Sequence, residues 1–120
     1  MGKRIMVVDD SRIIALQMKD LLEDTDYEVV AYCRNGEEAL AQYGRILPDI
    51  VTMDIIMPGL DGLETAQAIL EEYPDARIIM VSSLAYDDTF KEAEEIGAIG
   101  FIDKPFGREQ LLEAFGKAVG

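Results

Sequence analysis

The sequence contains no histidine and only one cysteine, and each shortage excludes a kind of chemistry. Without histidine the chain has no imidazole general base, no His-ligated metal site and no phosphohistidine of its own. The single cysteine, Cys33, cannot form an intrachain disulfide, and its position at the end of an apolar run indicates a small buried side chain. Neither redox nor imidazole chemistry is therefore expected.

Basic residues are also scarce, with 11 Lys and Arg against 24 Asp and Glu, so the formal net charge is −13. Nucleic acids and anionic membranes attract proteins with basic surfaces, so neither is an expected ligand. Long apolar runs are missing too: no stretch approaches the roughly 20 residues that span a bilayer, and the N-terminus lacks the pattern of a secretory signal. We expect a cytoplasmic protein whose partners carry basic patches.

What the sequence does have is an alternation of short apolar runs and helical patterns. At 120 residues, 49% of them hydrophobic, the chain fits a single domain over residues 1–120. Five runs rich in β-branched residues have the length of buried strands. They cover residues 4–9, 28–33, 49–54, 77–82 and 98–103.

Helical periodicity separates these runs. The inward-facing residues that it predicts are Ile14, Met18, Leu21 and Leu22 in the first helix, Leu40, Tyr43 and Leu47 in the second, Leu63, Ala66 and Leu70 in the third, and Leu111, Leu112, Phe115 and Val119 in the last. Asn35 and Glu38 have capping-box spacing at the start of the second helix. A weaker pattern over residues 86–96 offers only Phe90 and Ala93 as an inward pair.

Five strands that alternate with helices predict a doubly wound α/β fold, in which helices cover both faces of a parallel sheet. Ligands of such sheets bind beyond the carboxyl ends of the strands, where the winding reverses. Polar side chains stand at four of these ends, namely Asp9, Asp10, Asp54, Ser82 and Lys104. Each alone has an ordinary explanation as a turn former, a helix cap or a solvated charge. Their coincidence at one edge of the sheet predicts a functional site.

Three carboxylates that converge on one crevice repel one another unless a cation compensates them, and Mg²⁺ suits an all-oxygen ligand set. Because Mg²⁺ leaves positions for phosphate oxygens, the site favours phosphoryl transfer. Asp54 is then the candidate nucleophile, since a carboxylate forms an acyl phosphate. Lys104 would pair with the phosphoryl group, and Ser82 would donate a hydrogen bond to it.

Four stretches carry a resemblance to a known family, and they read VVDDS, PDIVTMDIIMPGLDG, IIMVSS and GFIDKPF. In this order and spacing they resemble the receiver domain of two-component response regulators, most of all the stand-alone receivers of bacterial chemotaxis. The resemblance implies a flavodoxin-like sheet of strand order 2-1-3-4-5 and a phosphoacceptor at Asp54. It also implies Mg²⁺ held by Asp10, Asp54 and the backbone carbonyl of Ile56, with Asp9 helping to organise the site.

The resemblance further implies how phosphorylation alters a distant surface. Ser82 would move toward the phosphoryl group, and Phe101 would turn inward to fill the space that Ser82 leaves. The peptide bond between Lys104 and Pro105 would be cis. The output face would comprise the fourth helix, the fifth strand and the fifth helix, at about residues 86–119.

The expected function is a switch that accepts a phosphoryl group from the phosphohistidine of a sensor histidine kinase or phosphotransfer protein, and then changes its affinity for a downstream target protein. It would catalyse only its own phosphorylation and dephosphorylation, as a monomer. Ile56 and Leu84 stand two residues after Asp54 and Ser82, and neither side chain orients a water for attack on an acyl phosphate. We therefore expect a long-lived phosphoryl group.

Three other functions are weighed against this one. A phosphatase resembling the haloacid dehalogenase family would need an acidic residue where Ile56 stands. An FMN carrier would need a hydroxyl- and glycine-rich phosphate loop after the first strand, where Asp9 and Asp10 would repel the phosphate. A purely structural interaction domain would leave the convergence of acidic residues unexplained. A piece of a longer regulator would show the same pattern as a stand-alone receiver.

Overall fold

The computed structural model describes residues 2–83 and 87–119, in which five strands alternate with five helices. The strands are β1 (Lys3–Val8), β2 (Tyr27–Cys33), β3 (Ile50–Asp54), β4 (Ile78–Ser82) and β5 (Gly100–Asp103). The helices are α1 (Arg12–Leu21), α2 (Gly36–Ile46), α3 (Gly62–Glu72), α4 (Asp87–Ile96) and α5 (Arg108–Val119). The predicted alternation is confirmed, including a helix at the weak pattern before residue 96.

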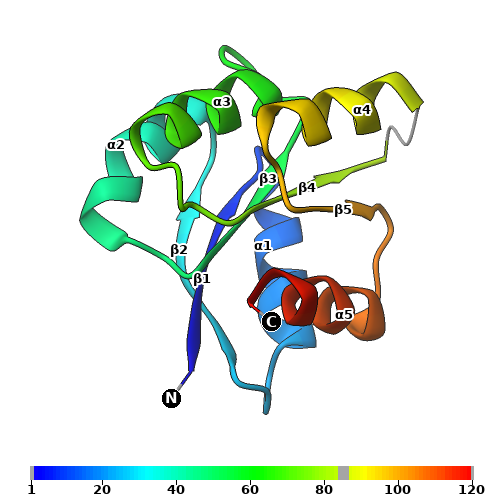
Figure 1. The fold of residues 1–120 in the computed structure, drawn as a ribbon. Coiled ribbons are helices and arrows are strands. Elements are labelled where there is room, and N and C mark those ends of the chain that lie inside the picture. The colour runs from blue at the N-terminus through cyan, green and yellow to red at the C-terminus, as the bar shows by residue number, and fades with distance from the viewer. Residues whose placement is uncertain (1, 84–86, 120) are drawn as a thin grey trace.

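The five described strands run parallel in one sheet, in the order β2-β1-β3-β4-β5 (Figure 1). β1 lies between β2 and β3, so the chain first winds to one side of β1 and then to the other. The carboxyl ends of β1 and β3 therefore lie side by side where the winding reverses. The flavodoxin-like strand order implied by the resemblance is confirmed.

Helices cover both faces of the sheet and divide the core into two clusters. α2, α3 and α4 lie on one face, while α1 and α5 lie on the other (Figure 1). Met53 and Met80 belong to the first cluster, and Met18, Ile50 and Phe115 belong to the second. β3 and β4 are buried along their whole length, which explains why their sequences are almost continuously apolar. None of the helices in the described part of the chain has the length and apolar content needed to cross a membrane.

The helix caps follow the predicted chemistry only in part. At the start of α2, the Asn35 side chain accepts a hydrogen bond from the Glu38 backbone N–H at 2.8 Å, as expected. The Glu38 carboxylate accepts from the Arg34 backbone N–H at 3.0 Å rather than completing a capping box with Asn35. A reciprocal box forms instead at the start of α3, between Asp61 and Glu64. The spacing therefore predicted the position of the α2 cap but not the partner of Glu38.

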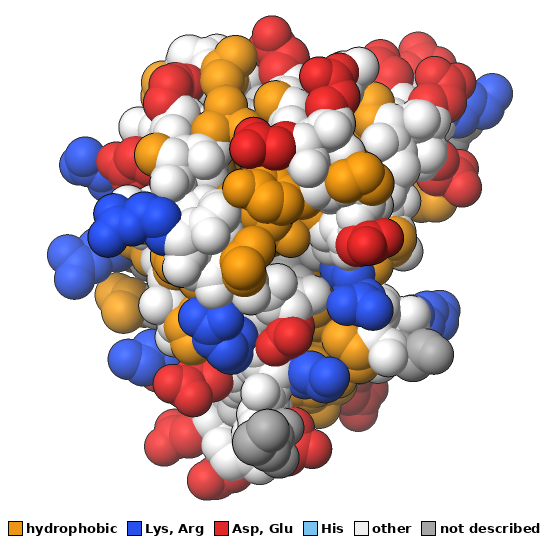
Figure 2. Space-filling view, turned by 60° about the vertical axis from the view of Figure 1, so that its left-hand side comes forward, with side chains coloured by type: hydrophobic (Ala, Val, Ile, Leu, Met, Phe, Trp, Pro, Cys, Tyr) orange, Lys and Arg blue, Asp and Glu red, His pale blue; other side chains and the backbone are white. Residues whose placement is uncertain are grey.

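Two predicted inward-facing residues of α2 are wrong. Leu40 is 38% exposed and Leu47 is 56% exposed, whereas Ala39 and Tyr43 are buried. Ala39 and Tyr43 are four residues apart and define the face that meets the sheet. Leu47 follows the last residue of α2 and has a left-handed backbone with φ of 47°, which directs it away from that face. Apolar side chains reach the surface in the middle of Figure 2, which views the side of the molecule where α2 lies.

The predicted inward pair of α4 is half wrong. Ala93 is buried in the first core cluster, but Phe90 is 48% exposed. The Phe90 ring lies over Phe101 of β5, with ring centroids 5.7 Å apart. β5 is an edge strand of four residues, so it offers too little surface to cover a phenylalanine ring fully.

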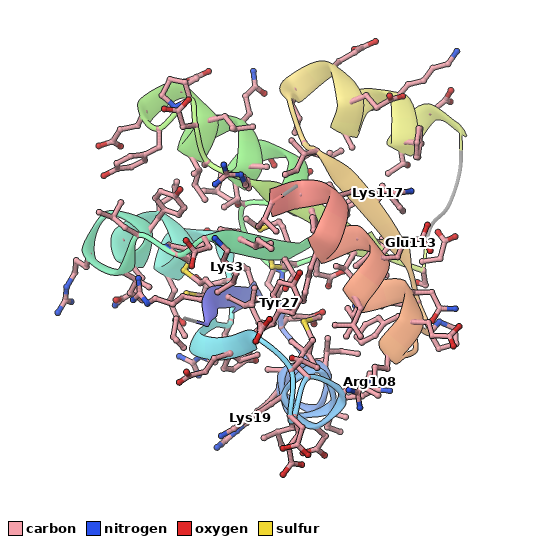
Figure 3. All side chains as sticks on the ribbon, turned by 60° about the horizontal axis from the view of Figure 1, so that its bottom comes forward. Lys3, Lys19, Tyr27, Arg108, Glu113 and Lys117 are labelled. Carbon is pink, nitrogen blue, oxygen red and sulfur yellow. The ribbon has the colours of Figure 1, made fainter. Side chains whose placement is uncertain are left out.

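The amino ends of the strands lie at the end of the sheet opposite the predicted site. Lys3 and Tyr27 are paired in the register of β1 and β2 and lie close together in Figure 3. The Tyr27 ring packs against Phe115 of α5, with centroids 5.0 Å apart. On the exposed side of α5, Lys117 and Glu113 form an ion pair at 3.2 Å (Figure 3). Aromatic packing therefore closes this end between β2 and α5.

Phe115 is fully buried, so we expect Phe115→Ala to lower the free energy of unfolding by about 3–5 kcal/mol in urea titrations, because it leaves a cavity in the second core cluster. Phe90→Ala serves as a control that removes the same atoms from a half-exposed position. We expect that control to cost about 1 kcal/mol or less. Equal losses in the two variants would contradict the assignment of the core.

Candidate functional site

Asp9 is held at the carboxyl end of β1 by backbone hydrogen bonds. Its N–H donates to the Cys33 carbonyl at 3.0 Å, which extends the pairing of β1 with β2. Its Oδ1 accepts from the Ser11 N–H at 2.8 Å. The side chain is buried, whereas the neighbouring Asp10 is exposed. Cys33 is buried as expected, and burial raises the pKa of its thiol to about 11, so the thiol stays protonated.

Asp54 stands at the end of β3, the strand in the middle of the sheet, and is only 7% exposed. The chain turns after it so closely that the Gly62 N–H donates to the Ile55 carbonyl at 2.7 Å. A Cβ on Gly62 would overlap the Asp54 carbonyl oxygen, so this position requires glycine. The sequence analysis did not identify Gly62, although the Asp61-Gly62 dipeptide is a turn signal.

Lys104 joins two of the carboxylates. Its Nζ lies 2.9 Å from Asp9 Oδ2 and 3.3 Å from Asp54 Oδ1. Its backbone N–H donates to the Ser82 carbonyl at 3.0 Å, so this hydrogen bond to β4 fixes the backbone position of Lys104. The Lys104–Pro105 peptide bond is cis, as expected. Burial lowers the pKa of the Lys104 ammonium, but the hydrogen bond to Asp9 and the charge of Asp54 outweigh that effect and raise it.

The environment of Asp54 disfavours its charged form. Burial raises the pKa of its carboxyl group, and the negative charge of Asp9 raises it further. The charge and hydrogen bond of Lys104 act in the opposite direction but do not prevail, so the pKa is about 6. One ammonium group therefore does not compensate the negative charge of this pocket.

The donor set fits a hard divalent cation. Asp9, Asp10 and Asp54 each offer a carboxylate oxygen, and these oxygens all lie within 4.8 Å of one another. Such an all-oxygen group, with one exposed member, suits Mg²⁺, which binds few protein carboxylates and keeps water ligands. The residues expected at the site are thus brought together from three strand ends. The fold and this pocket define a class of α/β protein with an acidic cation site at the topological switch point of the sheet.

The remaining predicted residues lie around this pocket. Ser82 ends β4 and is 2% exposed, and it pairs in register with Asp103 of β5. Phe101 is half-buried against Phe90. The side chain of Ile56 is 59% exposed, two residues beyond Asp54. Leu84 falls outside the described residues.

Comparison with known proteins gives the family. The family model described as "Response regulator receiver domain" matches residues 5–116, so the chain belongs to this family. The chemotaxis protein CheY of Listeria monocytogenes is 41% identical over 115 residues, covering 96% of this chain and 97% of that protein. The CheY protein of Thermotoga maritima is 39% identical over 117 residues, covering 98% of both.

Solved structures agree with this assignment. A chain in the crystal structure of the CheX-CheY-BeF3-Mg²⁺ complex from Borrelia burgdorferi is 31% identical, with a TM-score of 0.94 over 98% of this chain and 90% of that chain. The Vibrio cholerae chemotaxis protein CheY4 is 29% identical, with a TM-score of 0.90 over 98% and 99% of the two chains. This protein is therefore a homologue of CheY, and its acidic pocket with Lys104 is consistent with a phosphorylation-regulated signalling switch.

The raised pKa of Asp54 predicts a pH-dependent gain in stability for Asp54→Asn without metal. The folded state favours the protonated form of the Asp54 carboxyl group. The contribution of this protonated group to folding stability is complete below the ordinary pKa of 3.8 and is lost as the pH rises through about 6. In chelator, we expect Asp54→Asn to have little effect at pH 4 and to raise the free energy of unfolding at pH 8 by on the order of 2 kcal/mol. Urea titrations at both pH values measure this, and an equal effect at both would contradict it.

Proposed function

We propose that residues 1–120 form a single receiver domain that takes a phosphoryl group from the phosphohistidine of a sensor histidine kinase or phosphotransfer protein. The P–N bond of the donor breaks as a P–O bond to an Asp54 carboxylate oxygen forms, and the imidazole leaves with the electron pair. The main support is that Asp54 belongs to the three-carboxylate group and also lies 3.3 Å from the Lys104 ammonium. With a cation held by the carboxylates, Asp54 would lie between that cation and the Lys104 ammonium, and both charges would stabilise an incoming phosphoryl group.

Each residue has a separate role in this proposal. Asp10, Asp54 and the backbone carbonyl of Ile56 would hold Mg²⁺, and Asp9 would orient both the cation and Lys104. When bound, Mg²⁺ supplies positive charge that offsets the charge on the phosphoryl oxygens. Lys104 would exchange its contact with Asp54 for a contact with the phosphoryl group. Its raised pKa keeps it charged for this purpose.

Ser82 and Phe101 would carry the signal away from Asp54. Ser82 would donate a hydrogen bond to the phosphoryl group, and Phe101 would turn inward behind it. Phe101 lines a groove of about 510 Å³ between α4, β5 and α5, which supports this face as the output surface. Because packed cores adopt discrete arrangements, a ring that changes side there alters the binding surface as a unit.

The partners in this proposal are proteins. One is the phosphoryl donor, and the other is a downstream target that binds the groove beside Phe101. The CheX-CheY complex of Borrelia burgdorferi includes a chain of closely similar fold, which supports a CheX-like protein as a further partner. The proposal also includes a monomeric domain that works in the cytoplasm, with turnover limited to its own phosphoryl group.

The rival functions have less support. A haloacid dehalogenase-like phosphatase needs an acid two residues after its nucleophile, and Ile56 there is apolar and exposed. An FMN carrier needs a phosphate loop after β1, where Asp9 and Asp10 concentrate negative charge instead.

Incubation with acetyl phosphate and Mg²⁺ tests the proposed function. We expect intact-mass analysis to show one added phosphoryl group and peptide analysis to place it on Asp54. The modification should disappear in Asp54→Ala and in the presence of a chelator. Modification of wild-type protein at another residue, or an undiminished reaction in chelator, would overturn the proposal.

Ile56 should control how long the phosphoryl group persists. An amide side chain at this exposed position would orient a water for attack on the acyl phosphate. We therefore expect Ile56→Asn to shorten the lifetime of the acyl phosphate by roughly several-fold. Ile56→Leu is the matched control and should keep the wild-type decay. Radiolabel decay after removal of the donor measures both, and unchanged or slower decay in Ile56→Asn would show that this position does not limit hydrolysis.

A further inference from the structure

A buried hydroxyl group lies near the acidic pocket and has no role in the function proposed above. Among the described residues, the Tyr32 hydroxyl oxygen is a buried side-chain atom with no hydrogen-bond partner. An unsatisfied buried hydroxyl costs free energy, so its retention requires a reason. Its ring is partly buried and packs against the core cluster that α1 and α5 cover.

The position of Tyr32 directs attention to the cation site. Tyr32 pairs in register with Val7 on β1, and the next pair along the strands is Cys33 with Val8. Asp9 follows directly and bonds to Cys33, so Tyr32 lies two residues, or about 7 Å along the strand, before the first carboxylate. Val7 and Tyr32 both contribute to the second core cluster, so the Tyr32 side chain stands on the α1 side of the sheet.

The electrostatic environment agrees with this placement. Burial raises the pKa of the Tyr32 hydroxyl, and the negative charge of Asp9 raises it further, with a smaller contribution from Asp10. The positive charge of Arg34 opposes this effect without cancelling it. The hydroxyl is therefore a protonated donor within the field of two carboxylates of the site. Within the described part of the chain the Tyr32 hydroxyl bonds to neither carboxylate, so a water held by a cation in the pocket would supply the acceptor that it lacks.

We infer that Tyr32 is a positioning residue of the cation site, whose hydroxyl donates a hydrogen bond to a water ligand of the divalent cation held by Asp9, Asp10 and Asp54. Mg²⁺ keeps several waters in protein sites, and an outer partner that orients such a water strengthens binding. This inference rests on the proposed cation site. If Tyr32 has this role, its hydroxyl destabilises the cation-free protein and stabilises the protein with the cation bound.

Tyr32→Phe tests the inference because the two states should respond in opposite directions. In chelator the variant loses an unsatisfied buried polar atom, so its thermal midpoint should rise above that of wild type. In calorimetric titration its affinity for Mg²⁺ should fall about tenfold. The chain has no tryptophan, so Mg²⁺ should also produce a tyrosine ultraviolet difference spectrum in wild type that Tyr32→Phe lacks.

Tyr27→Phe is the matched control, since it removes a hydroxyl from the amino end of the same strand, far from the acidic pocket. The Tyr27 ring packs there on Phe115 (Figure 3). This variant should keep the wild-type Mg²⁺ affinity and difference spectrum. Wild-type Mg²⁺ affinity in Tyr32→Phe, or an equal loss in both variants, would overturn the inference while leaving the cation site intact. Failure of wild-type protein itself to bind Mg²⁺ at millimolar levels would overturn the cation site and the inference together.

Discussion

The balance of charge between three carboxylates and one ammonium group is the constraint on which this molecule depends. Lys104 lies 2.9 Å from Asp9 and 3.3 Å from Asp54, but a single positive charge leaves the pocket negative. Burial and this excess of negative charge together raise the pKa of Asp54, the proposed phosphoacceptor, to about 6. A bound divalent cation would remove this penalty, because it favours the charged form of each ligand. It would thereby complete the electrostatics of the pocket and favour the ionised form of Asp54.

The fold keeps these charges close together by fixing the backbone beneath them. Hydrogen bonds from Asp9 to Cys33 and from Lys104 to Ser82 attach the site to its neighbouring strands. The hydrogen bond from the Gly62 N–H to the Ile55 carbonyl at 2.7 Å holds the loop after β3 close to Asp54. Lys104 follows β5 directly, and Phe101 lies three residues earlier on the same short strand. A change in the contacts of Lys104 is thus adjacent to the aromatic ring that lines the groove between α4 and α5.

Particular residues show how far sequence reasoning reached. The five strands and the meeting of Asp9, Asp10, Asp54 and Lys104 at one end of the sheet were predicted, because apolar runs and the rule for switch points constrain them strongly. The strand order was implied only by the family resemblance. Leu40 and Phe90 were misplaced because helical periodicity gives a direction around a helix but not the extent of the surface that it meets. The partner of Glu38 was missed for a similar reason, since Arg34 competes for the same carboxylate. Gly62 was missed because the turn signal of Asp61-Gly62 does not show how closely the chain approaches Asp54. Tyr32 was missed because a tyrosine in a strand gives no sign of whether its hydroxyl finds a partner.

The sequence by itself determined the alternation of strands and helices and which chemical groups end each strand, since both follow from local patterns of apolar and polar residues. Only the tertiary structure decided which carboxylates Lys104 contacts and how far burial and Asp9 raise the pKa of Asp54. It also decided that the buried Tyr32 hydroxyl has no hydrogen-bond partner among residues 2–83 and 87–119. The physical reason is that charge coupling and burial depend on distances through space. Lys104 and Asp9 are 95 positions apart in the chain, so packing of the whole sheet sets the 2.9 Å between them.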